Sequence, residues 1–114
     1  MIQRAHLKKI EWIKSSQRSL KAFPDDARYQ AGSELLRVQE GKAPTDWKPM
    51  ASIGSGAIEI RIHMPHEHRV VYVAKFQEAI YVLHCFEKKV QKTAQRDIKH
   101  AKTAYAEMQR IRKG

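Results

Sequence analysis

The stretch "AIEIRIHMPHEHRVVYVAKFQEAIYVLHCF", residues 57–86, decides the fold of this chain. In its first part, residues 57–64, isoleucines alternate with Glu59, Arg61 and His63. A period of two is typical of a β-strand with one buried face and one polar face. We therefore expect a half-buried strand whose polar face carries these three side chains.

Two further segments of the stretch, residues 69–76 and 79–86, are apolar at almost every position. Strands that are apolar on both faces lie in the centre of a sheet. The sequence "PHEH", residues 65–68, indicates a turn before the first of them. Gln77–Glu78 is short enough for a hairpin between the two. The three strands therefore predict an antiparallel meander.

The residues before the meander predict an edge strand and two helices. A short apolar pattern within residues 7–13 indicates the edge strand, and a serine pair is suited to cap a helical piece over Gln17–Ala22. Apolar residues then recur at helical spacing over Pro24–Glu40. Residues 45–56 contain prolines and glycines and predict a connection.

The residues after the meander predict a C-terminal amphipathic helix. Thr93 is suited to cap it, and apolar side chains then share one face up to Ile111, while the opposite face is mostly basic. The element order β-α-α-β-β-β-α predicts an α+β fold, with residues 1–114 as a single domain. We expect the helices to cover one face of the sheet and the polar side chains of the strands to lie on the other.

The chain is strongly basic, with a net charge of +10. The excess is concentrated at its ends, because residues 1–23 carry +5 and residues 84–114 carry +6, whereas the middle is nearly neutral. A small soluble domain typically has a net charge of about 2–8 in magnitude. This distribution indicates a polyanion or an acidic protein as partner.

Several classes of protein are disfavoured by the sequence. No apolar stretch approaches the roughly 18–20 residues that span a membrane, and Met1–Lys9 lacks the apolar core of a signal peptide. Cys85 is the only cysteine, which excludes an internal disulfide and a CxxC motif. We therefore expect a cytoplasmic protein that has no membrane partner.

The sequence also disfavours metal and nucleophile chemistry. Three histidines lie close together in residues 63–68, but they lack the helical HExxH spacing, and a turn holds ligands poorly. We expect no metal and no cofactor. His84 and Cys85 are neighbours on a strand and point to opposite faces, so they cannot form a catalytic pair. Cys85 is expected in the core.

The sequence "HCFEKKVQKT", residues 84–93, places three lysines directly after the last strand. In an antiparallel meander this strand end lies beside the start of the preceding strand, so Lys88 and Lys89 come near Arg69. Arg61 belongs to the same end of the sheet. Such a cluster suits a phosphate group, because Arg binds it with two nitrogens and Lys acts as a point charge. A solvated, lysine-rich sheet edge explains the same spacing about equally well.

Four motifs follow one another along the chain: Glu59-Ile-Arg61, Arg69-Val-Val-Tyr72, the stretch from His84 to Thr93, and Asp97-Ile98 with Ala101. In this order they resemble the RelE/HigB superfamily of toxins, and within it the phage-derived Gp49-like branch of HigB-type toxins. The resemblance implies a small RelE-like domain. It also implies the toxin of a type II toxin–antitoxin system, a ribosome-dependent mRNA endonuclease that needs no metal.

The resemblance implies roles for individual residues and partners. One group would stabilise the phosphate while the ribose 2′-OH attacks it, and consists of Arg61, Arg69 and Lys89. A second group would contact the RNA, and consists of Lys88 and Lys92. From their place on the polar face of the sheet, His63 and His84 are expected to contact the RNA as well. The partners would be mRNA on the ribosome and a small helix-turn-helix antitoxin that neutralises the basic surface.

The chain departs from the family pattern near the residues that would move protons. Ala94 stands where this branch usually has a proline, and Tyr105 lies on the presumed core face of its helix. The general base stays open between His63, His68 and His84. Two other functions stay open as well: a non-catalytic nucleic-acid-binding or regulatory protein on the same fold, and a ParE-like toxin that acts on gyrase.

Overall fold

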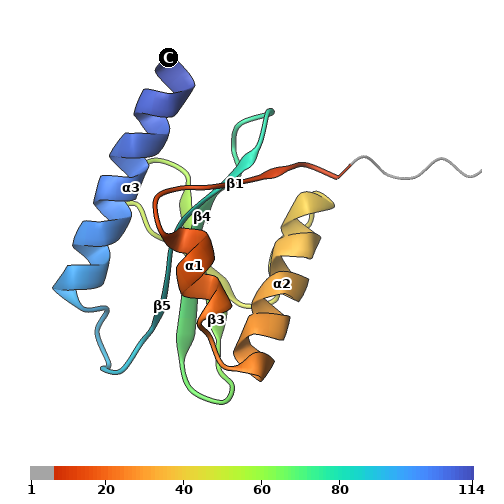
Figure 1. Ribbon diagram of the computed structural model, residues 1–114, viewed down its shortest axis with the longest axis vertical. Helices are drawn as coiled ribbons and strands as arrows, with labels where there is room; N and C mark the ends of the chain where they lie inside the picture. Colours follow the sequence, from red (N-terminus) through yellow and green to blue (C-terminus); the bar gives the residue numbers. More distant parts are fainter. Residues whose placement is uncertain (1–6) are drawn as a thin grey trace, which may run out of the picture.

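A computed structural model describes residues 7–114 (Figure 1). Within these residues the chain forms helices and one sheet in the predicted order, with one additional strand. The elements are β1 (Ile10–Trp12), α1 (Ser16–Lys21), α2 (Asp25–Gln39), β2 (Trp47–Pro49), β3 (Ala57–Ile62), β4 (His68–Val73), β5 (Ile80–Glu87) and α3 (Gln95–Lys113). The predicted α+β class is confirmed.

The strand order in the sheet is β1-β5-β4-β3-β2. Strands β3, β4 and β5 form the predicted antiparallel meander, and β1 runs parallel to β5 at one edge. At the other edge β2 pairs with β3, within the segment that we expected to be only a connection. Strand β2 is only three residues long, which is too short to show the alternation of apolar and polar residues that predicts a strand. Its proline is tolerated because the strand lies at the edge of the sheet.

The helices cover both faces of the sheet, so the expectation of a single covered face is wrong. Helices α1 and α2 pack on one face against Ile60, Val70 and Val82, whereas α3 packs on the other against Val71 and Leu83. Strand β4 is buried along its whole length and β5 along most of it, and both of their apolar faces therefore need a cover. Figure 1 shows α1 and α2 in front of the sheet and α3 along its left side.

The C-terminal helix differs from its prediction at both ends. It begins after Ala94, whose backbone is extended, so Thr93 is not its cap. Its packing against the sheet ends with Met108, and Ile111 is therefore exposed. Between these ends the predicted apolar face is correct, with Ala101 and Met108 fully buried.

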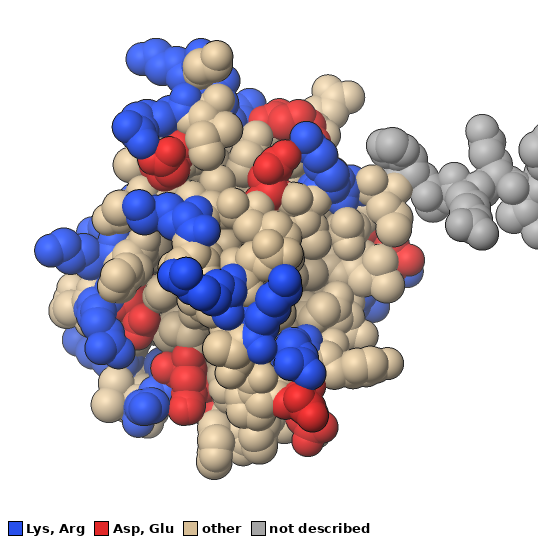
Figure 2. Space-filling view, in the orientation of Figure 1, with Lys and Arg blue, Asp and Glu red and all other residues tan. Residues whose placement is uncertain are grey.

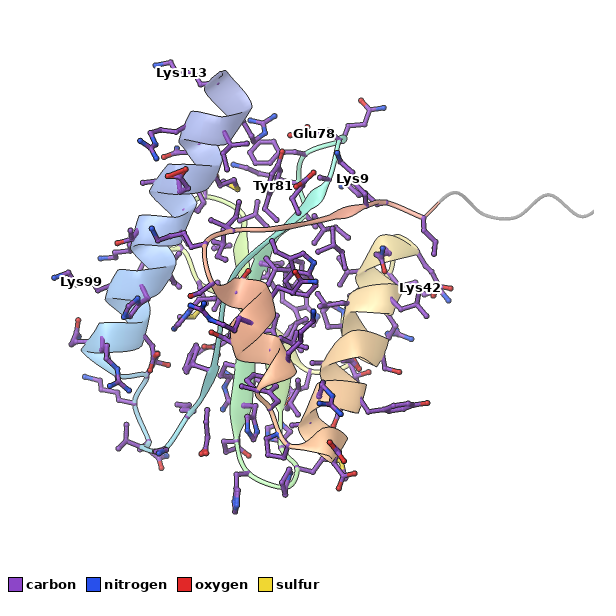
Figure 3. All side chains as sticks on the ribbon, in the orientation of Figure 1. Lys9, Lys42, Glu78, Tyr81, Lys99 and Lys113 are labelled. Carbon is purple, nitrogen blue, oxygen red and sulfur yellow. The ribbon has the colours of Figure 1, made fainter. Side chains whose placement is uncertain are left out.

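The last turn of α3 is held by Arg112. Its guanidinium carbon lies 3.4 Å from the ring centroid of Phe76, and its Nε lies 2.6 Å from a carboxylate oxygen of Glu78. Arg112, together with the hydroxyl of Tyr81, lowers the pKa of Glu78 to about 2. Figure 3 shows Glu78 and Tyr81 beside the C-terminal half of the helix. These contacts fix the end of α3 that lies far from the β3–β4 hairpin.

A β-bulge in β5 determines which side chains face α3. The register shifts between Val71 and Tyr72, which pair with His84 and Val82, so Leu83 is the extra residue. Leu83 and His84 consequently both face α3, whereas Cys85 faces α1 and α2. The bulge therefore brings His84 to the first turn of α3.

Tyr105 of α3 is a structural residue. Its ring packs so closely over Gly54 that a Cβ at that glycine would lie 2.4 Å from it. Its hydroxyl donates a hydrogen bond of 2.7 Å to the carbonyl oxygen of Ser55. The prediction that Tyr105 lies on the core face of the helix is confirmed.

The basic residues form a prominent part of the surface. Figure 2 shows Lys and Arg side chains over α1 and along α3, with acidic side chains scattered among them. In residues 7–114, no helix combines the length and the hydropathy that a membrane span requires.

Candidate active site

Two arginines stand opposite each other on neighbouring strands. Arg61 of β3 pairs with Arg69 of β4, and Arg69 pairs in turn with Phe86 of β5. All three face α3, because Val71, two residues after Arg69, belongs to the core beneath that helix. Arg69 is only 5% exposed. Like charges in this arrangement repel each other, so the pair needs counterions.

Lys88 and Lys89 join these arginines, as the meander predicted. The backbone N–H of Lys88 donates a hydrogen bond of 2.8 Å to the carbonyl oxygen of Glu67, which ties the end of β5 to the β3–β4 turn. Both lysines, Arg69 and Glu67 line a surface hollow of about 380 Å³, together with the two residues that follow Lys89. Three cations from two chain segments therefore surround one small depression.

The other predicted RNA-contacting residues of this sheet end, His63 and Lys92, do not line this hollow. His63 lines a neighbouring depression of about 540 Å³, which shares Glu67, Lys88 and Lys89 with the first. Lys92 is exposed in the connection between β5 and α3 and lines neither depression. The structure thus brings His63 to the cluster and leaves Lys92 at its periphery.

A buried carboxylate, Glu59, lies behind the arginines. The residue is 1% exposed, and its Oε1 lies 3.6 Å from Nε of Arg69, 3.9 Å from Nε of Arg61 and 4.0 Å from Nζ of Lys48. These cations come from three neighbouring strands, β4, β3 and β2. The second oxygen of the carboxylate, Oε2, is buried and has no hydrogen-bond partner in the part of the chain that the structure describes. Glu59 is therefore the internal counterion of the cluster.

Two exposed carboxylates complete the network. The Nη2 of Arg69 lies 2.9 Å from Oε1 of Glu67, and Nη1 of Arg61 lies 3.9 Å from Oδ1 of Asp46. His63 bridges these acids, with Nδ1 at 2.8 Å from Glu67 and Nε2 at 2.5 Å from Asp46. The hydrogen bonds to Asp46 and Glu67 raise the pKa of His63 above 6.5. Those from His63 and Arg69 lower the pKa of Glu67.

His84 pairs with Val71, two residue pairs further along the sheet than Arg69 and Phe86, and has the opposite electrostatic environment. Its ring stacks on Phe86 at a centroid distance of 5.1 Å and on His100 at 5.4 Å. Its Nε2 lies 2.9 Å from Oδ1 of Asp97. Burial lowers the pKa of His84 below 6.5, and Asp97 offsets this only in part. His84 is therefore neutral near pH 7, whereas the cation is favoured at His63.

His68 is not part of the site. Its side chain lies on the opposite face of β4, where its ring packs against Phe23 at 4.6 Å and is 1% exposed. The alternation of strand residues explains this, since Arg69 follows His68 directly. Cys85 lies in the same core, as predicted, and burial raises the pKa of its thiol. Neither side chain can reach a ligand at Arg69.

No group of three or more His, Cys, Asp or Glu side chains within residues 7–114 is placed to hold a metal ion. The functional groups of this sheet end are instead cations and the carboxylates that neutralise them. Such an arrangement can bind an anion that displaces the exposed carboxylates, and it can stabilise negative charge that develops on that anion.

The family of the chain follows from its sequence match. A model of the phage-derived protein Gp49-like family (DUF891) matches residues 18–106. The chain belongs to the Gp49-like family. The four motifs that suggested this branch all lie within the matched region, so the predicted family is confirmed. No curated protein matches the chain.

Four polar residues of the cluster were missed by the sequence prediction: Asp46, Lys48, Glu59 and Glu67. A signal existed for one of them, because Glu59 alternates with Arg61 on a strand and must share its face. Asp46 and Lys48 reach the site through β2, which the sequence did not indicate. Glu67 was placed in the turn without a partner.

Proposed function

We propose that this Gp49-like protein is the toxin of a type II toxin–antitoxin system and that it cleaves mRNA on the ribosome. The resemblance to RelE/HigB toxins supports this role. The observation that carries it is the convergence of Arg69, Lys88 and Lys89 on one hollow, with Arg61 directly opposite Arg69. A buried arginine, a half-buried lysine and an exposed lysine at such a depression favour a phosphodiester as ligand.

The proposed reaction is an attack of the ribose 2′-oxygen on its own phosphodiester. The 2′-oxygen bonds to phosphorus and gives its proton to a general base. The bond from phosphorus to the 5′-oxygen of the next nucleotide breaks, and that oxygen takes up a proton. The products are a 2′,3′-cyclic phosphate and a 5′-OH end. Arg61, Arg69 and Lys89 stabilise the extra negative charge on the phosphate oxygens.

The two histidines on this face suit different proton transfers. His84 is suited to accept a proton, because its lowered pKa favours the neutral form and its Nε2 donates to Asp97, so that Nδ1 is the acceptor. His63 is suited to donate a proton, because the hydrogen bonds to Asp46 and Glu67 raise its pKa and favour the cation. We assign contacts to the rest of the RNA to Lys88 and, at the periphery, to Lys92.

The partner of the toxin in this proposal is a small helix-turn-helix antitoxin that covers the basic surface. Net charge supports an acidic partner, since the chain carries +10. Two alternatives remain: a non-catalytic nucleic-acid-binding or regulatory protein, which needs the charge but not the buried Arg69, and a ParE-like toxin, which needs no phosphate cluster.

Expression of the chain in a bacterial host tests the proposal. We expect growth arrest and mRNA cleaved within translated regions. Arg69→Ala should relieve both, whereas Arg37→Ala, an exposed arginine of α2, should relieve neither. Intact mRNA with arrested growth would favour action on gyrase. Normal growth with the wild-type protein would favour the non-catalytic alternative.

A further inference from the structure

Glu59 has a role that the phosphate-stabilising cations alone do not explain. We propose that Glu59 is a positioning residue, whose buried carboxylate holds the guanidinium groups of Arg61 and Arg69 in the geometry that receives the phosphate. That the ligand is a phosphate rests on the proposed function. The arrangement of the three side chains is independent of that function.

The first argument is electrostatic. Arg61 and Arg69 are directly opposite each other, and their Nε atoms lie 3.9 and 3.6 Å from the same oxygen of Glu59. Without this carboxylate, two guanidinium groups and Lys48 would converge on one face with only exposed acids to neutralise them. Exposed ion pairs contribute little, whereas a buried cation without a partner is strongly destabilising.

The second argument comes from hydrogen bonding. Oε2 of Glu59 and Nε of Arg69 are both buried, and neither has a hydrogen-bond partner within residues 7–114. A buried carboxylate that lacks hydrogen bonds costs free energy, and an apolar side chain like the neighbouring Val71 would avoid this cost. The role of Glu59 therefore depends on the negative charge of its carboxylate and not on local packing.

The third argument concerns the direction in which Arg69 is open. Its Nη1 donates a hydrogen bond of 2.9 Å to the carbonyl oxygen of His68, and its Nε faces Glu59. Only Nη2 has an exposed partner, Glu67, whose side chain is 42% exposed. A phosphate can replace Glu67 but cannot replace Glu59. Glu59 thus fixes the Nε side of the Arg69 guanidinium, while Nη2 can exchange Glu67 for a phosphate.

The test compares Glu59→Gln with Glu59→Asp and with Glu107→Gln. The last variant removes one half-buried carboxylate of α3 outside the site, so it matches the change in net charge. We expect Glu59→Gln to bind single-stranded RNA at least as tightly as the wild type, because the net charge rises. Its cleavage rate on mRNA in a reconstituted translation system should fall by about 100-fold, since the guanidinium groups are misplaced. Glu59→Asp should recover part of this loss. An unchanged cleavage rate in folded Glu59→Gln would overturn the inference.

A second measurement needs neither cleavage nor a variant. In nitrogen-15 spectra of the wild-type protein, the Nε–H of Arg69 should exchange slowly with water, and rotation about its terminal bonds should be hindered. Fast averaging at neutral pH, as expected for the exposed Arg18, would overturn the inference even if Glu59→Gln did not fold. If the wild type cleaves no RNA, the proposed function fails, and this measurement still decides the role of Glu59.

Discussion

The Nε of Arg69 lies 3.6 Å from Oε1 of Glu59, and both residues are almost completely buried. The two come from adjacent strands, and Arg61 and Lys48 approach the same oxygen. An ion pair of this kind contributes to stability only while both partners are present, because each alone would be a buried charge. The site and the stability of the sheet end are therefore coupled.

The coupling between Glu59 and Arg69 should be measurable as a change in the free energy of unfolding when either residue or both are replaced. We expect Arg69→Met to lower it by about 3 kcal/mol, because Glu59 loses its nearest cation. The double variant Glu59→Met/Arg69→Met should regain most of this loss. Urea unfolding of Glu59→Met, Arg69→Met, the double variant and the wild type forms a double-mutant cycle. Additive losses would contradict the coupling.

The pKa values of the two histidines on the α3 face, His63 and His84, should be shifted from 6.5 in opposite directions. The pKa of His63 is raised, chiefly by Asp46 and then by Glu67, so its contribution to stability is present below pH 6.5 and is lost as the pH rises through the folded pKa. The pKa of His84 is lowered by burial, so stability falls as the pH drops from 6.5 toward its folded pKa. Imidazole chemical shifts measured against pH give both values.

Two variants serve as controls for the assignment of these shifts. Asp46→Asn should bring the pKa of His63 back toward 6.5, because its largest raising contact is lost. Asp97→Asn should lower the pKa of His84 further, because Asp97 opposes the effect of burial. Equal pKa values for His63 and His84 in the wild type would contradict the opposite environments of the two side chains.

The contact between Gly54 and Tyr105 predicts an asymmetry between two glycines. A Cβ at Gly54 would lie 2.4 Å from the Tyr105 ring, so Gly54→Ala should destabilise the protein by about 1–3 kcal/mol through overpacking. Gly32, in the middle of α2, has nothing within 4 Å of such a Cβ. Gly32→Ala should therefore stabilise by about 0.5–1 kcal/mol. Thermal unfolding of both variants checks this, and equal effects would refute the contact.

The meander and its consequence for the site could be predicted because strand periods are local. Alternation placed Arg61 and Glu59 on one face, and the order of the strands placed Lys88 beside Arg69. The two-sided apolar pattern of β4 and β5 also indicated helices on both faces, although we expected one covered face.

The remaining features depend on tertiary structure that no local pattern carries. The burial of Glu59 requires β2, a strand of three residues without a period of its own. The contact of His84 with Asp97 requires a bulge at Leu83, which shifts the alternation by one residue. The sequence alone could have excluded His68 as a base. It directly precedes Arg69 on the same strand, so the two side chains point to opposite faces of the sheet.

The lysines of the hollow should determine the salt dependence of RNA binding. Each phosphate contact that is lost should reduce the slope of log affinity against log salt by about 0.7 for a single strand. We expect this change for Lys88→Ala and for Lys89→Ala, and a smaller one for Lys92→Ala. Lys42→Ala is the control, since Lys42 follows α2 on another part of the surface (Figure 3). Equal slopes for all four variants would show that binding is not centred on the hollow.

The exposed carboxylate Glu67 should compete with RNA for Arg69. Glu67 lies 2.9 Å from Nη2 of Arg69 and lines the hollow, so it occupies the place of a phosphate oxygen. We expect Glu67→Gln to bind single-stranded RNA several-fold more tightly at low salt. Fluorescence anisotropy with a short labelled RNA measures this, with Glu40→Gln as a matched loss of one exposed carboxylate. Weaker binding by Glu67→Gln would contradict the competition.

The chemistry of the cleaved ends tests the central claim most directly. The purified protein is incubated with ribosomes that translate a defined mRNA, and the ends of the fragments are analysed. Attack by the 2′-OH predicts a 5′-OH on each downstream fragment and a cyclic or 3′-phosphate on each upstream fragment, with no cleavage by Arg69→Ala. Intact mRNA, or fragments with 5′-phosphates, would contradict the account.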